Sequence, residues 1–515
     1  MSVETFGAID VGSDEITLTI AECSKKNGIR FIDQVTHRIN LGGDTFQTGK
    51  ISYEHVSELE KLLSEYRAIM DDYGVKNYKA YGTSAIREMV NRTVVLSEIE
   101  QRTGIHIDVL SNSEQRFLDY KSIAAKGGDF AKIIEKSTAI VDIGGSSIQI
   151  SLFDKDRLVT TQNMKLGVLR LYDQMKNIDA GQNRRDYCLN ELVNSQLQVF
   201  TNLYMQSRTV QNIIVVDDYF SPIVQNRQLT GSDDPGYIDV TMFKRFLEVA
   251  RNHNAQDLAR KLSVSDDNVP LLYINAMLID CIINAVNAEL IWAPGVTLCD
   301  GIVYEYAQNQ KYITPKHDFE EDIIACAENT AHRYMGLKER REAMLNIALR
   351  IFDSTKKYHG LGSRERLLLR IAAILHDCGK YISMVDSSDC AYDIIMSTEI
   401  IGLSHVEREI VANVVKYNHT NFVYYGEQTF MSDLDRNAYL TIAKLTAILR
   451  ITNGLDRSHT QKFDNVRIRI EDDKMYIIVN SDQDLTMERG LFARRADFFE
   501  EIFGIRPEIK QKRPE

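Results

Sequence analysis

The sequence is poor in cysteine and contains no paired-cysteine motif. Its seven cysteines are scattered over 515 residues, at positions 23, 188, 281, 299, 326, 378 and 390. Isolated thiols of this kind are typical of reduced core or surface cysteines, so we expect a cytoplasmic protein. The first residues lack a basic segment followed by an apolar one, and no apolar run reaches the length of a membrane span. We therefore expect neither a secretion signal nor an association with membranes.

Basic residues are in the minority. The chain has 61 lysines and arginines against 73 aspartates and glutamates, a net charge of −12. This balance argues against a general nucleic-acid-binding protein, although a local basic cleft could still hold a polyanion. The 44% hydrophobic and 26% charged residues are ordinary for a globular protein. At this length one hydrophobic core is not enough, and we expect three or four domains.

The most informative stretch covers residues 137–152. A short apolar run ends at Asp142 and a glycine pair, Gly144 and Gly145, and an alternating apolar segment follows. This pattern predicts a β-hairpin. Because glycine lets the backbone approach a ligand closely, the N–H groups of the turn could cradle a phosphate. Asp142 could then hold Mg²⁺ against that phosphate, directly or through water.

A second copy of this pattern lies near the N-terminus. An apolar run ends at Asp10, Gly12 and Ser13 follow, and residues 16–20 alternate again. One copy alone could equally be an ordinary hairpin turn. Two copies about one domain apart favour two phosphate-binding hairpins that face each other across a cleft, with Asp10 and Asp142 near one Mg²⁺ position.

The order of the predicted elements divides the chain into four parts. Strands alternate with helices twice, over residues 1–125 and 126–312, and each part opens with the same hairpin, as expected for duplicated α/β lobes. Amphipathic helices dominate residues 313–460. Residues 461–515 return to two strands and a helix, a small α/β domain.

Four ordered motifs resemble the exopolyphosphatase/guanosine pentaphosphate phosphatase family. They are Asp10-Val11-Gly12-Ser13, Gly82-Thr83-Ser84-Ala85-Ile86-Arg87, Asp142-Ile143-Gly144-Gly145 and Leu166-Gly167-x-x-Arg170-Leu171. The resemblance covers essentially the whole chain. It implies an actin-like (ribonuclease H-like), two-lobed ATPase-type fold, followed by an all-α HD-type domain and a small α/β end domain. In such enzymes Mg²⁺ and a glutamate-activated water remove the terminal phosphate of inorganic polyphosphate or pppGpp, and the family often forms homodimers.

The resemblance also assigns candidate site residues. Arg87, with its planar guanidinium, suits a phosphoryl oxygen, although on its own it could be an exposed helix residue with a solvated head. Metal binding falls to Asp10 and Asp142. The remaining catalytic candidates are Glu114, Gln115 and Gln149. The phosphate-binding candidates are Gly12, Ser13, Asp14, Thr83, Ser84, Gly144, Gly145, Ser146 and Ser147.

The departures from the family pattern bear directly on catalysis. The family's base position holds Gln115, and an amide cannot accept a proton from water near neutral pH. Glu114 points about 100° away on the helix and cannot simply substitute for it. A second family carboxylate is replaced by Gln149. Asp14 and Glu15 add negative charge beside the first turn, where they could bind metal, rebuild a base or repel a polyanion. In addition, residues 215–218, Val-Val-Asp-Asp, stand where the family has a Gly-Ser-Gly-Thr phosphate loop.

The helical part retains only some residues of a metal-binding HD site. His376 and Asp377 are present, but Asn453 stands at the position of the last aspartate, and Cys390 at that of an intermediate histidine. Several N and O ligands must converge on a metal. We therefore expect His376 to be a helix-end residue with a local partner, and the domain to bind no transition metal tightly.

Three functions are compatible with these residues. The first is a Mg²⁺-dependent phosphohydrolase acting on polyphosphate or pppGpp, with slow but measurable turnover. The second is a regulatory protein that binds polyphosphate or nucleotide and has lost efficient hydrolysis. The third, more weakly supported, is a phosphotransferase that uses the same cleft.

Overall fold

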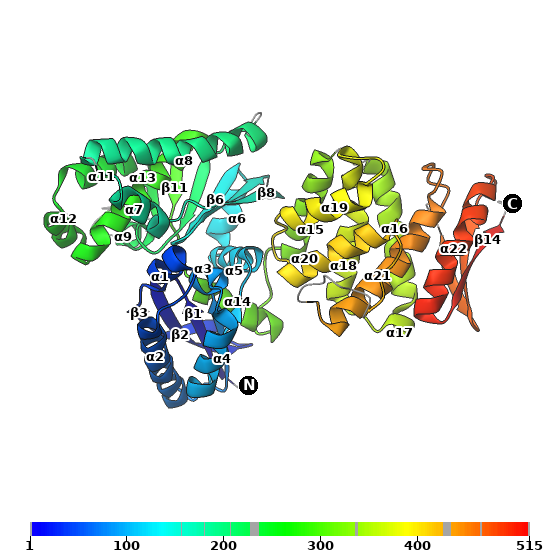
Figure 1. Ribbon diagram of the computed structural model, residues 1–515, viewed down its shortest axis with the longest axis horizontal. Coiled ribbons are helices and arrows are strands. Elements are labelled where there is room, and N and C mark those ends of the chain that lie inside the picture. The colour runs from blue at the N-terminus through cyan, green and yellow to red at the C-terminus, as the bar shows by residue number, and fades with distance from the viewer. Residues whose placement is uncertain are drawn as a thin grey trace. The chain divides into compact units, whose positions relative to one another are not determined.

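The computed structural model describes residues 3–512, except for 156, 180, 206–207, 227–235, 335–337, 426–433 and 464–465 (Figure 1). The chain separates into two compact units, Met1–Phe319 and Glu320–Glu515. The boundary lies seven residues after the predicted one at 312/313. The finer division into four domains stays a prediction, and the two units are described separately here.

The first part of unit 1, which we call lobe I, is built on a five-stranded sheet. Its strand order is β3-β2-β1-β4-β5, with β1 antiparallel to β2 and parallel to β4. The strands are β1 (Glu4–Val11), β2 (Glu15–Ser24), β3 (Gly28–Arg38), β4 (Asn77–Gly82) and β5 (Asp108–Val109). The helices are α1 (Leu41–Thr48), α2 (Tyr53–Asp72), α3 (Ser84–Glu88), α4 (Arg92–Thr103) and α5 (Asn112–Ala124).

Lobe II repeats this arrangement on a six-stranded sheet. The order is β10-β11-β9-β6-β7-β8, and β6 is antiparallel to β7 and parallel to β9, as β1 is to β2 and β4. The strands are β6 (Thr138–Ile143), β7 (Ile148–Asp154), β8 (Arg157–Met164), β9 (Asn212–Val216), β10 (Tyr237–Asp239) and β11 (Leu290–Trp292). The helices are α6 (Gly128–Ile134), α7 (Val168–Lys176), α8 (Gln182–Tyr204), α9 (Ser221–Gln225), α11 (Val240–Asn252), α12 (Ala255–Leu262) and α13 (Val269–Val286). The shared topology agrees with the expectation of duplicated halves.

The helix that ends the predicted second lobe belongs to the core of the first. α14 (Leu298–Asn309) packs against α5 and β1, and its apolar residues share one buried cluster with those of β1 and β2. The sequence analysis placed residues 126–312 together as lobe II, so the structure corrects this part of the division. A helix buries its apolar face wherever a complementary surface is available, and adjacency in sequence does not decide which sheet provides it.

Gly301 brings α14 and α5 into backbone contact. A Cβ atom at this position would lie 2.1 Å from the carbonyl oxygen of Leu118 on α5. We expect Gly301→Ala to separate the two helices and to lower the free energy of unfolding of unit 1 by about 1–3 kcal/mol, the usual cost of overpacking.

Fluorescence of Trp292, the single tryptophan, during urea unfolding measures this change. Gly128→Ala is the matched control, because a Cβ atom at Gly128 meets nothing within 4 Å. Equal stability of the Gly301→Ala variant and the wild type would contradict the close packing of α14 on α5.

The helix α13 is more hydrophobic than the sequence analysis allowed for. An 18-residue window within Asp266–Val286 has a mean hydropathy of 1.8, and the segment is long and apolar enough to cross a membrane by length and composition. However, 72% of that window is buried inside the structure, where α13 packs against α7, α8 and α11. Burial in the core of lobe II accounts for its composition.

Unit 2 is a helical array with a small sheet at its end (Figure 1). α21 packs against α16, α20 and α22, and the sheet has the order β12-β13-β14. The helices are α15 (Phe319–Arg333), α16 (Lys338–Ser354), α17 (Lys356–His359), α18 (Ser363–Leu375), α19 (Ser387–Ser397), α20 (His405–Tyr417), α21 (Arg436–Leu455) and α22 (Thr486–Phe503). The strands are β12 (Arg467–Glu471), β13 (Lys474–Asn480) and β14 (Arg506–Lys512). The predicted helical stretch and the predicted return to strands are both present.

Candidate active site

The two hairpin turns meet in one cavity of unit 1. A cleft of about 390 Å³ is lined by Asp10, Gly12 and Ser13 from the first turn and by Gly145 from the second. A Cβ atom placed on Gly145 would lie 3.3 Å from Cβ of Ser13, so the turns are in direct contact. The structure thus brings the two turns together, as the repeated pattern predicts.

Each turn is tight and leaves amide groups available. Gly12 N–H donates to the carbonyl of Glu15, and Gly144 N–H donates to that of Ser147, both at 3.0 Å. A Cβ atom on Gly12 would lie 2.6 Å from the Glu15 carbonyl oxygen, so glycine is required there. Within the described residues, five turn amides have no acceptor, those of Ser13, Asp14, Gly145, Ser146 and Ser147. Such a set of N–H groups can bind an anion.

The segment after β8 supports the second turn. Amides at the start of α7 donate to the Gly144 and Gly145 carbonyls, at 3.0–3.2 Å. Arg170 donates from Nε to the Ser146 carbonyl at 3.1 Å and from Nη2 to Glu88 of lobe I at 3.1 Å. This accounts for the Leu-Gly-x-x-Arg motif, which fixes the turn and ties it to the other lobe.

The loop that precedes α3 adds hydroxyl groups to the first turn. Thr83 N–H donates to the Val11 carbonyl at 3.1 Å, and the Ser84 hydroxyl lies 2.6 Å from that of Ser13.

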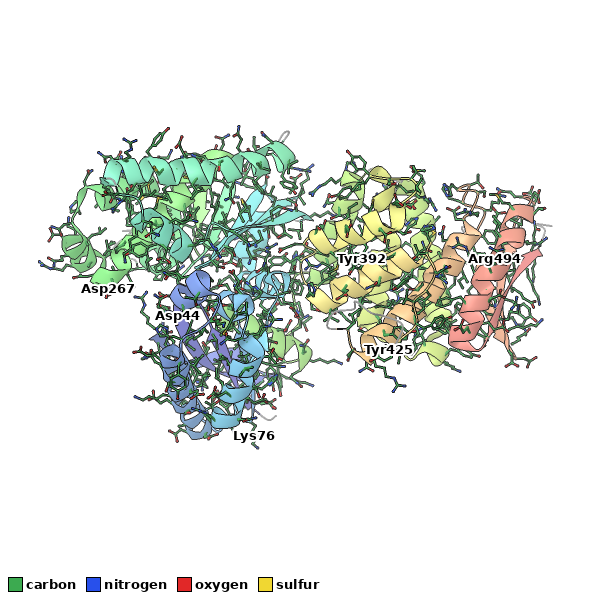
Figure 2. All side chains as sticks on the ribbon, viewed as in Figure 1. Asp44, Lys76, Asp267, Tyr392, Tyr425 and Arg494 are labelled. Carbon is green, nitrogen blue, oxygen red and sulfur yellow. The ribbon has the colours of Figure 1, made fainter. Side chains whose placement is uncertain are left out.

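Figure 2 shows Asp44 on the neighbouring helix α1, at the border of the two lobes. There Gln47 Nε2 donates to Asp173 of α7 at 3.4 Å. Candidate phosphate-binding groups from both lobes therefore share one region.

Arg87 and Gln115 are neighbours. Arg87 donates from Nη1 to the Leu110 carbonyl at 2.6 Å and approaches Gln115 Oε1 at 3.5 Å. The positive charge of Arg87 also acts on Asp142, where it favours the ionised carboxylate. Arg87 is therefore not an exposed helix residue with a solvated head. It contacts Gln115 at the base position, and its charge acts on Asp142.

Glu114 has a structural partner. Its Oε2 accepts the Ser111 N–H at 2.9 Å, and Ser111 Oγ accepts the Glu114 N–H at 3.2 Å, a capping box at the start of α5. Ser-x-x-Glu at residues 111–114 is the sequence signature of a capping box, so this role of Glu114 could have been predicted from the sequence. A carboxylate held against its own helix terminus is poorly placed to activate water.

Asp14 and Glu15 are both paired with Arg38 of β3. Arg38 Nη2 donates to Asp14 Oδ2, and Nε donates to Glu15 Oε1, each at 3.1 Å. The Tyr219 hydroxyl also donates to Asp14 Oδ2, at 3.4 Å. Arg38 offsets part of the charge that these residues bring to the cleft, and sequence reasoning did not find this partner.

Gln149 is buried and bound to an arginine that the sequence analysis did not single out. Gln149 lies directly across the hairpin from Asp142, and its Oε1 accepts Arg116 Nε at 2.5 Å. Arg116 also donates from Nη1 to the Thr161 hydroxyl. Its side chain is buried within the site, and its charge favours the ionised form of Asp142.

Burial and mutual repulsion dominate the electrostatics of the cleft. Burial, together with the charges of Asp142 and Glu15, raises the pKa of Asp10 to about 7. Burial raises the pKa of Asp142 to about 6, against the opposing effect of Arg116. Asp119 on α5, not identified from the sequence, contacts Asp142, and burial and the Asp142 charge raise the pKa of Asp119 well above its usual value. Because these three carboxyl groups are buried close together, it is unfavourable for all of them to be ionised at once.

The Val-Val-Asp-Asp segment contributes two further carboxylates. Asp217 Oδ1 accepts the N–H groups of Phe220 and Ser221, at 3.0 and 2.7 Å. These amides at the start of α9 are therefore already hydrogen-bonded within the protein. The walls of the cleft shield the Asp218 carboxylate from water. This desolvation, together with the charges of Glu15 and Asp10, raises the pKa of Asp218 well above its usual value. The third loop therefore presents acids where the resemblance implies phosphate-binding groups.

The donor set of the cleft fits a hard divalent cation. Oδ1 of Asp10 is buried and receives no hydrogen bond from the described residues, and carboxylate oxygens are the ligands that Mg²⁺ prefers. No three acidic, histidine or cysteine side chains of the described chain converge on one coordination sphere. Mg²⁺ commonly retains several waters and is completed by substrate phosphates, so one or two carboxylates suffice.

Unit 2 holds an arginine beside the His376-Asp377 pair. Arg340 of α16 donates to Asp377 and, at 3.3 Å, to Asn453 Oδ1, and Lys380 Nζ lies 2.7 Å from Asp377 Oδ1. His376 directly follows α18, and its Nδ1 donates to the Ala373 carbonyl at 2.7 Å. His376 is thus the predicted helix-end residue with a local partner, whereas the HD-type assignment stays a prediction.

Fold and site together define the class. Two sheets of repeated topology, each with an Asp-x-Gly hairpin at a shared cleft, make unit 1 an actin-like, two-lobed protein whose turns present N–H groups that suit an anion. The comparisons with known proteins then identify the family. The profile of the Ppx/GppA phosphatase family matches residues 19–310, and that of Ppx/GppA phosphatase domain III matches residues 325–496. The chain belongs to this family.

Similar proteins are distant in sequence and cover most of the chain. A guanosine-5'-triphosphate,3'-diphosphate pyrophosphatase from Photobacterium profundum is 19% identical over 453 residues, covering 86% of each chain. Exopolyphosphatase 1 from Mycobacterium leprae is 21% identical over 345 residues, 65% of this chain and 96% of that one. The solved structure of an exopolyphosphatase from Cytophaga hutchinsonii covers 60% of this chain and 100% of its own, with a TM-score of 0.53 and 18% identity. At 18% identity, the similarity to this solved structure establishes the fold.

Proposed function

We propose that this protein is a Mg²⁺-dependent phosphohydrolase that releases the terminal phosphate of inorganic polyphosphate or pppGpp. One observation carries the proposal: the two hairpin turns meet at one cleft, Asp10 and Asp142 lie near the ends of the strands that lead into them, and the charge of Arg87 acts on Asp142. The relatives' names, exopolyphosphatase and guanosine-5'-triphosphate,3'-diphosphate pyrophosphatase, agree with a phosphoanhydride substrate.

The residues of the cleft have separable tasks. The free amides of the two turns bind and orient the phosphate chain, and the hydroxyls of Ser13 and Ser84 can donate to the same oxygens. Arg87 offers a guanidinium to the terminal phosphoryl group, which is transferred to water. Asp10 and Asp142 would hold Mg²⁺, which neutralises charge on the transferring and leaving oxygens when bound.

The missing base limits the rate in this proposal. Phosphoryl transfer depends mainly on positioning and on charge stabilisation, both of which the cleft retains. At the base position, Gln115 can orient a water through its amide and cannot accept the proton. We therefore expect turnover that is slow and measurable.

Phosphate release by the purified full-length chain tests the proposal. We expect release from long-chain polyphosphate or pppGpp in the presence of Mg²⁺, little release with a chelator, and loss of activity in Asp142→Asn. Asp129→Asn, on the exposed surface of α6, is the control and should behave as the wild type. Phosphate release that is indifferent to chelator and to Asp142→Asn would contradict the proposal.

A regulatory role is the second candidate. The observation that favours it is the loss of carboxylates at both Gln115 and Gln149, combined with Asp217 in place of a third phosphate loop. In that case the chain would bind polyphosphate or pppGpp with Mg²⁺ and release no phosphate. Equilibrium binding of the same substrates, measured beside turnover, separates the two candidates.

A further inference from the structure

Two charged residues of α5, three positions apart, lie against the base of the second hairpin. Arg116 and Asp119 project from one face of the helix. Arg116 binds Gln149, which stands directly across the hairpin from Asp142. Asp119 contacts Asp142 itself. Gln149 and Asp119 are thus two neighbours of the same carboxylate, and only the second of them is acidic.

Asp119 lies against Asp142 at the base of the second hairpin. Their carboxyl groups are within hydrogen-bonding contact of each other, and two carboxylates at that separation cannot both ionise unless a proton or a cation lies between them. Asp10 and Asp218 add further negative charge at this point. Arg116 and Arg87 supply the nearby positive charges. These two positive charges face four carboxyl groups, those of Asp119, Asp142, Asp10 and Asp218.

Two oxygen atoms of this group lack donors. Oδ2 of Asp119 and Oδ1 of Asp10 are buried, and no donor among the described residues reaches them. Asp119 is only 5% exposed. An ionised oxygen in such surroundings is costly unless a cation or a donor satisfies it. The unsatisfied atoms therefore point to a ligand that the protein itself does not provide.

We propose that Asp119 is a third carboxylate of the divalent-cation site, beside Asp142 and Asp10, and that it replaces the carboxylate lost at Gln149. The inference rests on the proposed function and adds a residue outside the recognised motifs. Since the three side chains do not converge on a single coordination sphere, contact with the cation runs partly through the waters that Mg²⁺ retains.

Binding of Mn²⁺ to the full-length chain, followed by electron paramagnetic resonance, tests this assignment without any turnover. Mn²⁺ accepts the same carboxylate and water ligands as Mg²⁺. We expect Asp119→Asn and Asp142→Asn each to weaken Mn²⁺ binding at least tenfold, and the surface variant Asp129→Asn to leave it unchanged. The amide of Asp119→Asn can still donate to Asp142, so the metal-free variant should unfold no earlier than the wild type. Asp119→Ser provides a second variant in case the first fails to fold.

A carboxylate swap tests the replacement itself. In the Asp119→Asn background, Gln149→Glu returns a carboxylate to the other side of Asp142, and we expect it to restore Mn²⁺ binding to within about threefold of the wild type. Failure to restore it would overturn the claim of replacement. If Asp119→Asn binds Mn²⁺ as the wild type does while Asp142→Asn does not, Asp119 is excluded and the proposed function stands. If the wild type binds no Mn²⁺, the cation requirement of the proposed function fails as well.

Discussion

Gln115→Glu is expected to raise the rate of phosphate release by about 10²- to 10⁴-fold, the usual contribution of a general base. Arg87 Nη1 lies 3.5 Å from Gln115 Oε1, so a glutamate at this position would be held beside the Arg87 guanidinium. Its carboxylate could take a proton from the attacking water, which the amide cannot do. Binding of the substrate should change little, because the turns that hold the phosphates are untouched.

Steady-state phosphate release from polyphosphate and pppGpp measures this effect, with KM compared between the two forms. Gln101→Glu, an exposed position on α4, adds the same charge away from the cleft and is the matched control. A wild type that already turns over rapidly, unaffected by Gln115→Glu, would show that another carboxylate is the base. Asp14, Glu15 and Glu114 would then be tested by alanine substitution. If both forms are inert while the substrate binds, the regulatory function becomes the better account.

Arg340→Leu is expected to destabilise unit 2 by about 3–5 kcal/mol, because removing one partner of a buried ion pair leaves a buried charge uncompensated. The Arg340 side chain is 4% exposed, and its partners Asp377 and Asp456 are 16% and 1% exposed. Arg340 contacts both acids, and Lys380 reaches only Asp377. The guanidinium thus supplies positive charge to both acids.

Hydrogen–deuterium exchange in the full-length chain can localise the effect. Peptides from α16, α18 and α21 should exchange about 10²- to 4 × 10³-fold faster in Arg340→Leu, since each 1.4 kcal/mol is a factor of ten. Lys338→Leu, whose side chain is 74% exposed, should leave their exchange unchanged. Treatment of the wild type with a chelator should also have no effect on these peptides. Faster exchange after chelation would show that a metal, and not Arg340, stabilises this region.

Local pattern was enough to predict the hairpins and the family. Alternating apolar residues on either side of Asp10-Val11-Gly12 and Asp142-Ile143-Gly144 define strands and tight turns without reference to any distant residue. The duplication of this pattern was therefore visible in the sequence, as were the helices of unit 2, which follow from apolar periodicity. The order of four short motifs identified the family for the same reason.

Contacts between distant segments could not be predicted in this way. Arg38 pairs with Asp14 and Glu15 because β3 lies beside β2 in the sheet, and Arg340 reaches Asp377 across 37 positions of sequence because α16 packs against α18. The approach of Asp119 to Asp142 likewise depends on how α5 meets the second hairpin. Residue types and local periodicity do not encode these distances.

The sequence by itself determined which turns could bind phosphate and which carboxylates were missing. Only the tertiary structure decided that Glu114 closes a capping box, that α14 returns to lobe I and that Asp119 lies against Asp142. The physical reason is that local backbone preference and side-chain periodicity act over a few residues, whereas the charge environment of a buried group is set by every segment that packs around it.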